Sequence, residues 1–242
     1  MNDEFYVGYV PRAPASLGRR MARLTVGLIL VGLGVGSVLL VDQPPFADSK
    51  FEYGTTGEYY GIFEQHPYPT LHSGDRTYLL VAPGKHGLTV ATDLQSKSVQ
   101  LRGTLIQRGA DRMLEVLPAS VRPNESSSPA PSEQPVSLGT ITLRGEIVDS
   151  KCYLGVMNPG NRKVHRDCAV RCISGGSPPA FTAADGAGNT RVLLLVGSDG
   201  RALNRELLAL VGEPVEISGE LVRSDSLLLL KTEPAKFRRL AE

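Results

Sequence analysis

The feature that most constrains this chain is an uncharged stretch of 18 residues near its N-terminus, Leu24 to Val41. A helix of roughly 17–25 apolar residues crosses the hydrocarbon core of a bilayer, so this stretch is long enough to span one. It is longer than the apolar region of an ordinary secretory signal, and no small-residue cleavage site precedes "DQPPFADSK". The sequence therefore predicts one retained transmembrane helix. A cleaved signal of the twin-arginine type, suggested by "GRRMARL", is the alternative.

The charges that flank this stretch are unequal. Only one basic residue, Lys50, lies in the twenty residues after it, whereas four arginines precede it: Arg12, Arg19, Arg20 and Arg23. The excess of positive charge marks the cytoplasmic side. Arginine outnumbers lysine in the chain, which favours a GC-rich bacterial host. We therefore expect a single-pass protein of the bacterial inner membrane, with residues 1–23 in the cytoplasm and residues 42–242 in the periplasm.

Two glycines inside the apolar stretch, Gly32 and Gly36, form a G-x-x-x-G pattern. Small residues at this spacing let two helices approach closely in lipid, where packing is the main attractive force. Glycine is also common in membrane helices without such a role. The pattern favours contact with a helix of a partner subunit.

Beyond the apolar stretch the chain carries a faint internal repeat. Each copy has an alternating strand, a glycine, a second strand, a turn and an apolar strand. The paired segments are 56–65 with 142–151, 76–87 with 191–201, and 98–118 with 214–234. Between the copies, residues 119–137 are rich in Ser, Pro and Glu, which predicts a flexible linker.

The repeat predicts a mainly β fold with two small domains, residues 50–118 and 138–242. Five short strands with a helix before the last pair are typical of an OB-like barrel, and a β-sandwich is the alternative. In the second domain we expect that helix at residues 204–211, with Asn204 as its N-cap.

The net charge is +1 and only 6% of residues are aromatic. Neither domain shows the basic and aromatic groove of an oligonucleotide-binding barrel, so nucleic acid is not an expected partner.

All three cysteines and one of the four histidines lie within residues 148–181. His165, Cys168 and Cys172 are spaced i, i+3 and i+7, which places them on one face of a helix. A short helix is expected because "KVHRDCAVRCI" has no Pro or Gly and is followed by "SGG". Cys152 ends the preceding strand, across the turn "MNPGN". These four donors predict a tetrahedral Cys3His shell for a structural zinc ion, with no open coordination position.

A disulfide is the competing interpretation. Thiols oxidise outside the cytoplasm, and two cysteines four residues apart on a helix, Cys168 and Cys172, lie close enough to pair. Cys152 could pair with either of them. A disulfide leaves one thiol over and gives His165 no role. A further redox or cofactor role for the three cysteines is the third possibility.

The sequence "GEIVDSKC" (145–152) followed by "CAVRC" (168–172) has a D-S-x-C start and a later C-x-x-x-C, and "VEISGELV" (215–222) forms a closing strand. In these features residues 138–234 resemble small secreted bacterial OB-like domains of unassigned function. This chain has a longer insert between the cysteines, and "GGSPP" after the last one. The resemblance implies a fold and no activity.

No catalytic motif stands out in the sequence. It lacks G-x-S-x-G, H-E-x-x-H, a P-loop and an EF-hand loop. "APGKHG" (82–87) lacks the spacing of a Walker motif and predicts only a turn. His66 and His72, in "HPYPTLH", are expected to be solvated loop residues. We therefore expect a protein that is not an enzyme.

These observations lead to three hypotheses about function. The first is a non-catalytic, membrane-anchored accessory subunit of a bacterial electron-transfer or respiratory complex, whose periplasmic β domains dock on partner subunits. The second is a periplasmic thiol-redox or metal-handling protein, in which the cysteines exchange electrons or ions. The third is a cell-envelope assembly factor.

Overall fold

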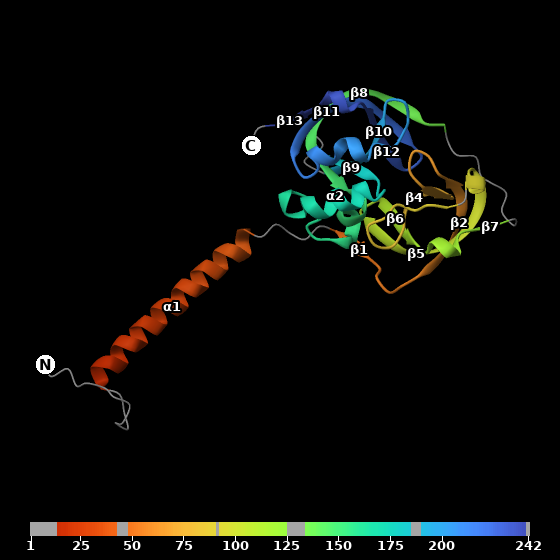
Figure 1. The fold of residues 1–242 in the computed structure, drawn as a ribbon. Helices are drawn as coiled ribbons and strands as arrows, with labels where there is room; N and C mark the ends of the chain where they lie inside the picture. The colour runs from red at the N-terminus through yellow and green to blue at the C-terminus, as the bar shows by residue number, and fades with distance from the viewer. Residues whose placement is uncertain (1–13, 43–47, 91, 125–133, 185–189, 241–242) are drawn as a thin grey trace. The chain divides into compact units, whose positions relative to one another are not determined.

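The computed structural model describes residues 14–42, 48–90, 92–124, 134–184 and 190–240. The chain divides into two compact units, Met1–Phe46 and Ala47–Glu242. Among these described residues, the first unit contains the helix α1 (Ala15–Asp42), and the strands lie in the second (Figure 1). The fold is mainly β, as the sequence predicts.

Helix α1 is 28 residues long and none of its residues is buried in the protein. At a rise of about 1.5 Å per residue it is longer than the roughly 30 Å hydrocarbon core of a bilayer. Its composition and length make it a candidate membrane span. Gly32 and Gly36 are open on the surface of the helix, so contact with a partner helix stays a prediction. Arg12 lies outside the described residues.

The first barrel consists of five strands that pair in a closed ring, in the order β2-β3-β4-β6-β5-β2. All neighbours are antiparallel except β4 and β6, which run parallel. Strands β1 and β7 both pair with β5. The elements are β1 (Ser49–Phe51), β2 (Gly57–Glu64), β3 (Thr70–Ser73), β4 (Arg76–Val81), η1 (Thr92–Leu94), β5 (Lys97–Arg108), β6 (Asp111–Val116), η2 (Pro118–Ser120) and β7 (Arg122–Pro123).

The second barrel repeats this order as β8-β9-β10-β12-β11-β8, with β10 and β12 parallel and β13 added to β11. It runs from green to blue in Figure 1. The elements are β8 (Val136–Asp149), η3 (Cys152–Val156), η4 (Lys163–His165), α2 (Arg166–Ser174), β9 (Pro179–Ala184), β10 (Thr190–Gly197), η5 (Arg205–Leu210), β11 (Pro214–Ser224), β12 (Leu227–Thr232), η6 (Pro234–Lys236) and β13 (Phe237–Arg239).

The two barrels share the strand order of the OB fold, a closed five-stranded barrel. The repeat seen in the sequence falls on equivalent strands: β2 corresponds to β8, β4 to β10, and the β5–β6 hairpin to the β11–β12 hairpin. The predicted helix before the last strand pair is the short helix η5. The OB-like interpretation is therefore confirmed.

The barrels are packed on each other through a shared apolar core. Each barrel also has a core of its own. The shared core contains buried side chains from both barrels and from the connection between β8 and β9: Leu79, Val81, Ile106, Met113, Val148, Tyr153, Leu154, Ala180 and Leu194. Burial of apolar area is the main stabilising term in folding, so this core joins the barrels into one body.

The ends of the predicted linker at 119–137 take part in this body. Strand β7 pairs with β5, and β8 begins at Val136 and continues as the first strand of the second barrel. Residues 125–133, the centre of the predicted linker, lie outside the described residues.

One hydroxyl group adds a polar link between the barrels. Tyr68 lies between β2 and β3 of the first barrel and is only 3% exposed. Its hydroxyl group donates to the carbonyl oxygen of Leu195 at 2.7 Å and accepts from the backbone N–H of Leu203 at 2.9 Å. Both partners belong to the second barrel.

Replacement of Tyr68 by Phe is therefore expected to destabilise the two-barrel body. The change leaves a buried N–H and a buried carbonyl without a partner, which costs about 1–3 kcal/mol. Urea unfolding of the full chain in detergent, followed by circular dichroism, measures this loss. Tyr60→Phe is the matched control, because Tyr60 is 44% exposed and its hydroxyl group bonds Glu58 at the surface. Equal unfolding midpoints for the two variants would contradict the interpretation.

Candidate metal and thiol centre

The cysteines lie in the connection between the first two strands of the second barrel, residues 150–178. The predicted helix is present: η4 leads directly into α2, which ends at Ser174. Cys152 differs from the prediction, because β8 ends at Asp149 and Cys152 opens the helical turn η3 instead. This turn packs against β1, β5 and β6 of the first barrel. The connection is therefore held between the barrels.

A buried carboxylate fixes the start of the connection. Asp149 is completely buried and accepts hydrogen bonds from the backbone N–H groups of Cys152 at 2.9 Å and Lys151 at 3.3 Å. It also accepts a bond from the hydroxyl group of Ser177, at the other end of the connection. Charged acceptors make stronger hydrogen bonds than neutral ones. Asp149 therefore sets the position of Cys152 and closes the base of the connection.

The end of helix α2 is fixed by a side chain from elsewhere in the barrel. The amide group of Asn204 donates to the carbonyl oxygens of Ile173 and Ser177, both at 2.9 Å. Asn204 stands at the N-cap position of η5, but its side chain makes no cap bond there. The predicted capping role is therefore wrong. A buried helix end needs partners for its last carbonyls, and Asn204 supplies one to Ile173.

The three sulfur atoms meet at this connection. The Sγ atoms of Cys152, Cys168 and Cys172 all lie within 4.8 Å of one another, and the three cysteines are free. Cys152 and Cys172 are buried, while Cys168 is half-buried. Of the four predicted ligands, these three therefore lie together. Together they could hold a metal ion.

His165 lies in a second, overlapping group. Its ring nitrogen, a carboxylate oxygen of Asp149 and the Sγ atom of Cys152 also lie within 4.8 Å of one another. Among the described residues, no group within this mutual distance contains all four predicted ligands. Cys152 belongs to both groups and joins them. A shift of the imidazole ring is therefore needed to complete a Cys3His shell around one ion.

The imidazole of His165 is in the chemical form that binds metals. The residue is 5% exposed, and burial lowers its pKa, which keeps the ring neutral. A neutral imidazole nitrogen is a common metal ligand. Within the described part of the chain, the Nε2 atom of His165 is buried without a hydrogen-bond partner. A buried polar atom without a partner is rare and costly, and a bound ion would satisfy it.

A lysine from the first barrel faces the sulfur atoms. Lys85 lies in the turn after β4, and its Nζ atom is 2.7 Å from the Sγ atom of Cys168 and 3.9 Å from that of Cys172. The contact with Cys168 raises the pKa of Lys85. The hydrogen bond shared by the thiol groups of Cys152 and Cys172 raises the pKa of Cys152 and lowers that of Cys172. An ammonium group and a thiolate therefore stabilise each other at this site.

A second lysine fixes the turn that carries Lys85. The side chain of Lys151 is 4% exposed, and its Nζ atom donates to the carbonyl oxygens of Ala82 at 2.9 Å and Gly84 at 2.7 Å. It also forms an ion pair with Glu115 of β6. Neither lysine's role could be predicted from local sequence patterns. "APGKHG" is a turn, as predicted, and it is held against the cysteines by contacts between residues far apart in the chain.

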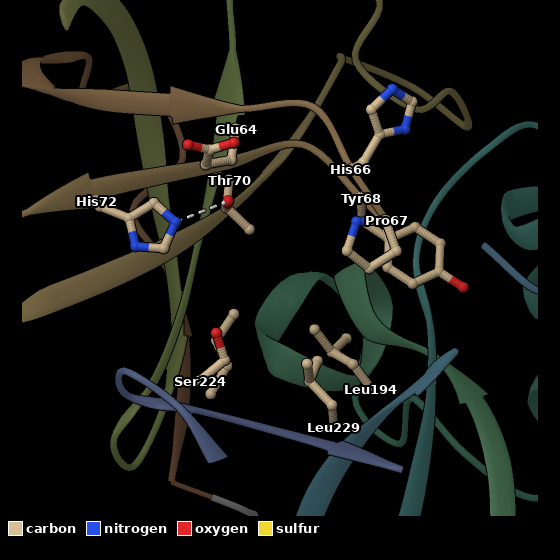
Figure 2. A pocket seen from close by; sticks show the side chains of 10 residues that line it. Glu64, His66, Pro67, Tyr68, Thr70, His72, Leu194, Ser224 and Leu229 are labelled. Carbon is tan, nitrogen blue, oxygen red and sulfur yellow. Dashed lines mark hydrogen bonds between the residues drawn. The ribbon is translucent and has the colours of Figure 1, made fainter. Parts of the chain in front are cut away.

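Two histidines of the first barrel, His66 and His72, line a separate cleft between the barrels (Figure 2). The cleft has a volume of about 190 Å³. The Nδ1 atom of His72 lies 2.8 Å from the Oδ2 atom of Asp225, and the imidazole of His66 points away from that of His72. Neither histidine belongs to a potential metal-binding group among the described residues.

Comparison with known proteins gives no match among protein-family models, curated proteins or solved structures. The interpretation of the site therefore rests on its own donor atoms. Three thiols and a neutral imidazole are a donor set of structural zinc sites. Soft sulfur ligands also suit Cu(I) and iron–sulfur clusters.

Replacement of Lys151 by Met is expected to lower the free energy of unfolding by about 3 kcal/mol, because Glu115 and two carbonyl groups lose a buried partner. Urea unfolding of the full chain in detergent measures the change. Lys50→Met is the matched control: Lys50 pairs with Glu52, but its side chain is 65% exposed. An exposed pair contributes little, so the control is expected to unfold like the wild type. A Lys151→Met chain as stable as the control would show that this ion pair does not hold the turn.

Proposed function

We propose that this chain is a non-catalytic, single-pass accessory subunit of a bacterial inner-membrane complex, with its two-barrel body in the periplasm and a structural Cys3His zinc centre. The complex is of the electron-transfer or respiratory type. The observation that carries the proposal is the convergence of three cysteine sulfurs in the connection that joins the barrels, with His165 beside Cys152 in an overlapping group. A closed shell of this kind stabilises a fold and leaves no coordination position for a substrate.

The surroundings of the donors support a structural role for the metal. The base of the connection is fixed by Asp149 and its turn η3 packs on the first barrel. A zinc ion bound to Cys152 and to two residues of α2 would close the connection on itself. Metal binding to residues that only the folded state brings together stabilises that folded state. The ion would therefore hold the surface that joins the barrels in one shape, as a docking subunit requires.

The membrane location is supported by α1 and the charges beside it. The helix is long and apolar enough to span a bilayer. Arg19, Arg20 and Arg23 lie in its N-terminal half and favour a cytoplasmic N-terminus. The barrels then fold on the opposite side. Gly32 and Gly36 offer a close-packing face to a helix of a partner subunit.

One contact favours a second candidate function, a thiol-redox protein of the periplasm. The Nζ atom of Lys85 touches the half-buried Cys168 sulfur, which solvent can reach. A cation beside a cysteine favours the reactive thiolate. In this function the cysteines would exchange electrons with a partner, and a metal ion would be absent or displaced.

Metal analysis tests the zinc centre. The full chain, purified in detergent under reducing conditions, is expected to contain about one zinc ion per chain. Cys172→Ser and His165→Ala are expected to lower zinc affinity at least about tenfold, and His86→Ala, an exposed histidine in the Lys85 turn, is the control. Wild-type protein without metal, or equal zinc binding in all three variants, would contradict the centre.

Blue-native electrophoresis of gently solubilised native membranes tests the accessory role. We expect the chain to migrate in a large complex and to co-purify with integral membrane subunits. Gly32→Leu/Gly36→Leu is expected to weaken that association, because the larger side chains prevent close helix contact. Protease added to spheroplasts should digest the barrels. Migration of the wild type as a free monomer, or barrels that only a cytoplasmic protease can reach, would oppose the proposal.

A further inference from the structure

We infer that Lys85 and Cys168 form an oxygen-bridged cross-link, Nζ–O–Sγ, when dioxygen reaches the metal-free chain, and that this link competes with the metal ion for Cys168. The competition rests on the proposed zinc centre. The cross-link does not, because it needs only the two side chains and dioxygen. It would make the centre a redox-controlled connection between the barrels.

The distance between the two atoms carries the inference. The Nζ atom of Lys85 and the Sγ atom of Cys168 are 2.7 Å apart. This is near the short limit of N–H···O hydrogen bonds, about 2.7–3.2 Å, and sulfur is a larger acceptor than oxygen. The separation is too short for an ordinary N–H···S contact and too long for a direct N–S bond. Two single bonds through one bent oxygen atom span it.

The turn that carries Lys85 is held against the end of α2 on one side and by Lys151 on the other. The carbonyl oxygen of Lys85 lies so close to Gly175, at the end of α2, that no side chain fits there. The backbone N–H of Gly87 donates to the carbonyl oxygen of Gly175 at 2.9 Å. Lys151 holds the other side of the turn through Gly84. Groups fixed in a reactive geometry behave as if at very high concentration, so a slow oxidation becomes selective for this pair.

Access to solvent also singles out this pair. Lys85 is exposed and Cys168 is half-buried, whereas Cys152 and Cys172 are buried. Dioxygen therefore reaches Cys168 more easily than the other two sulfurs. Oxidation of cysteine depends on exposure, which Cys168 has and the two buried cysteines lack.

The reaction balances with dioxygen as the oxidant. One amine, one thiol and one O2 molecule give the N–O–S link and one water molecule. An N–H bond and the S–H bond break together with the O–O bond, and an N–O and an O–S bond form. Dioxygen takes four electrons, two from nitrogen and two from sulfur. Four electrons from an added thiol or phosphine, with four protons from the thiol or from water, return the free amine, the free thiol and water.

The link and the metal exclude each other at Cys168. A sulfur atom bonded to the bridging oxygen has no thiolate to donate, and thiolate is the form that binds zinc. Cross-linking leaves only Cys152, Cys172 and His165, an incomplete shell. In place of coordination, the cross-link then joins α2 covalently to the turn after β4 of the first barrel. Both states hold the barrels together, but only the reduced state carries metal.

Peptide mass spectrometry tests the inference on the full chain in detergent. One portion is stripped of metal and exposed to air, and another is kept anaerobic with a phosphine. In the air-exposed portion we expect a peptide that joins Lys85 to Cys168, heavier than the two free peptides by one oxygen and lighter by two hydrogens. The phosphine should abolish it. Lys85→Arg keeps the positive charge and should never form it, whereas Lys97→Arg, at an exposed site, should behave as the wild type.

The outcomes separate this inference from the proposed function. Absence of the oxygen-containing peptide from the air-exposed wild type would overturn the inference, whether or not the reduced chain binds zinc. A peptide joined without oxygen, or a disulfide that includes Cys168, would also overturn it. If the air-exposed wild type yields the oxygen-containing peptide, and the reduced wild type and Lys85→Arg both bind zinc, the cross-link and the metal centre are both supported. The same peptide in a chain that never binds zinc would support the cross-link and refute the metal centre.

Discussion

The arrangement of the site depends on the buried carboxylate of Asp149. It lies at the end of β8. It accepts hydrogen bonds from the backbone N–H of Cys152, where the connection begins, and from the hydroxyl group of Ser177, two residues before β9 begins. A fully buried charge is tolerated only when it is well hydrogen-bonded, so this carboxylate strongly favours one conformation of the connection. Cys152 is separated from α2 by a turn and a short helix, so the chain alone does not place its sulfur beside those of Cys168 and Cys172. The hydrogen bonds of Asp149 to both ends of the connection help to bring the three sulfur atoms together.

The cysteine connection of the second barrel has a counterpart in the first barrel. Each of the two connections contacts the opposite barrel. In both barrels the link between the first and second strands reaches the other barrel near the end of its third strand. Tyr68 of the first barrel bonds Leu195 and Leu203, and the cysteine connection of the second meets Lys85. The repeat therefore produced two similar contacts. One of them contains a hydroxyl group and an open cleft, and the other contains thiols, an imidazole and a lysine.

Local patterns allowed much of this structure to be predicted. The uncharged stretch predicts α1, the repeat predicts equivalent strands in two barrels, and the spacing of His165, Cys168 and Cys172 predicts the helix. What the sequence did not reveal are contacts between distant residues: Lys85 and Cys168 are 83 positions apart. Asn204 shows the same limit, because its position favours a helix cap while its side chain serves another helix. Hydrophobic periodicity reports which face is buried, and it contains no information about which polar groups meet there.

The central claim is that three cysteines and His165 bind one metal ion between the barrels. X-ray absorption spectroscopy of the reduced full chain, loaded with zinc in detergent, tests it most directly because it counts ligand atoms by element. The account predicts three sulfur atoms at about 2.3 Å and one nitrogen atom at about 2.0–2.1 Å from zinc. A first shell made of oxygen and nitrogen atoms, with no sulfur, would contradict it.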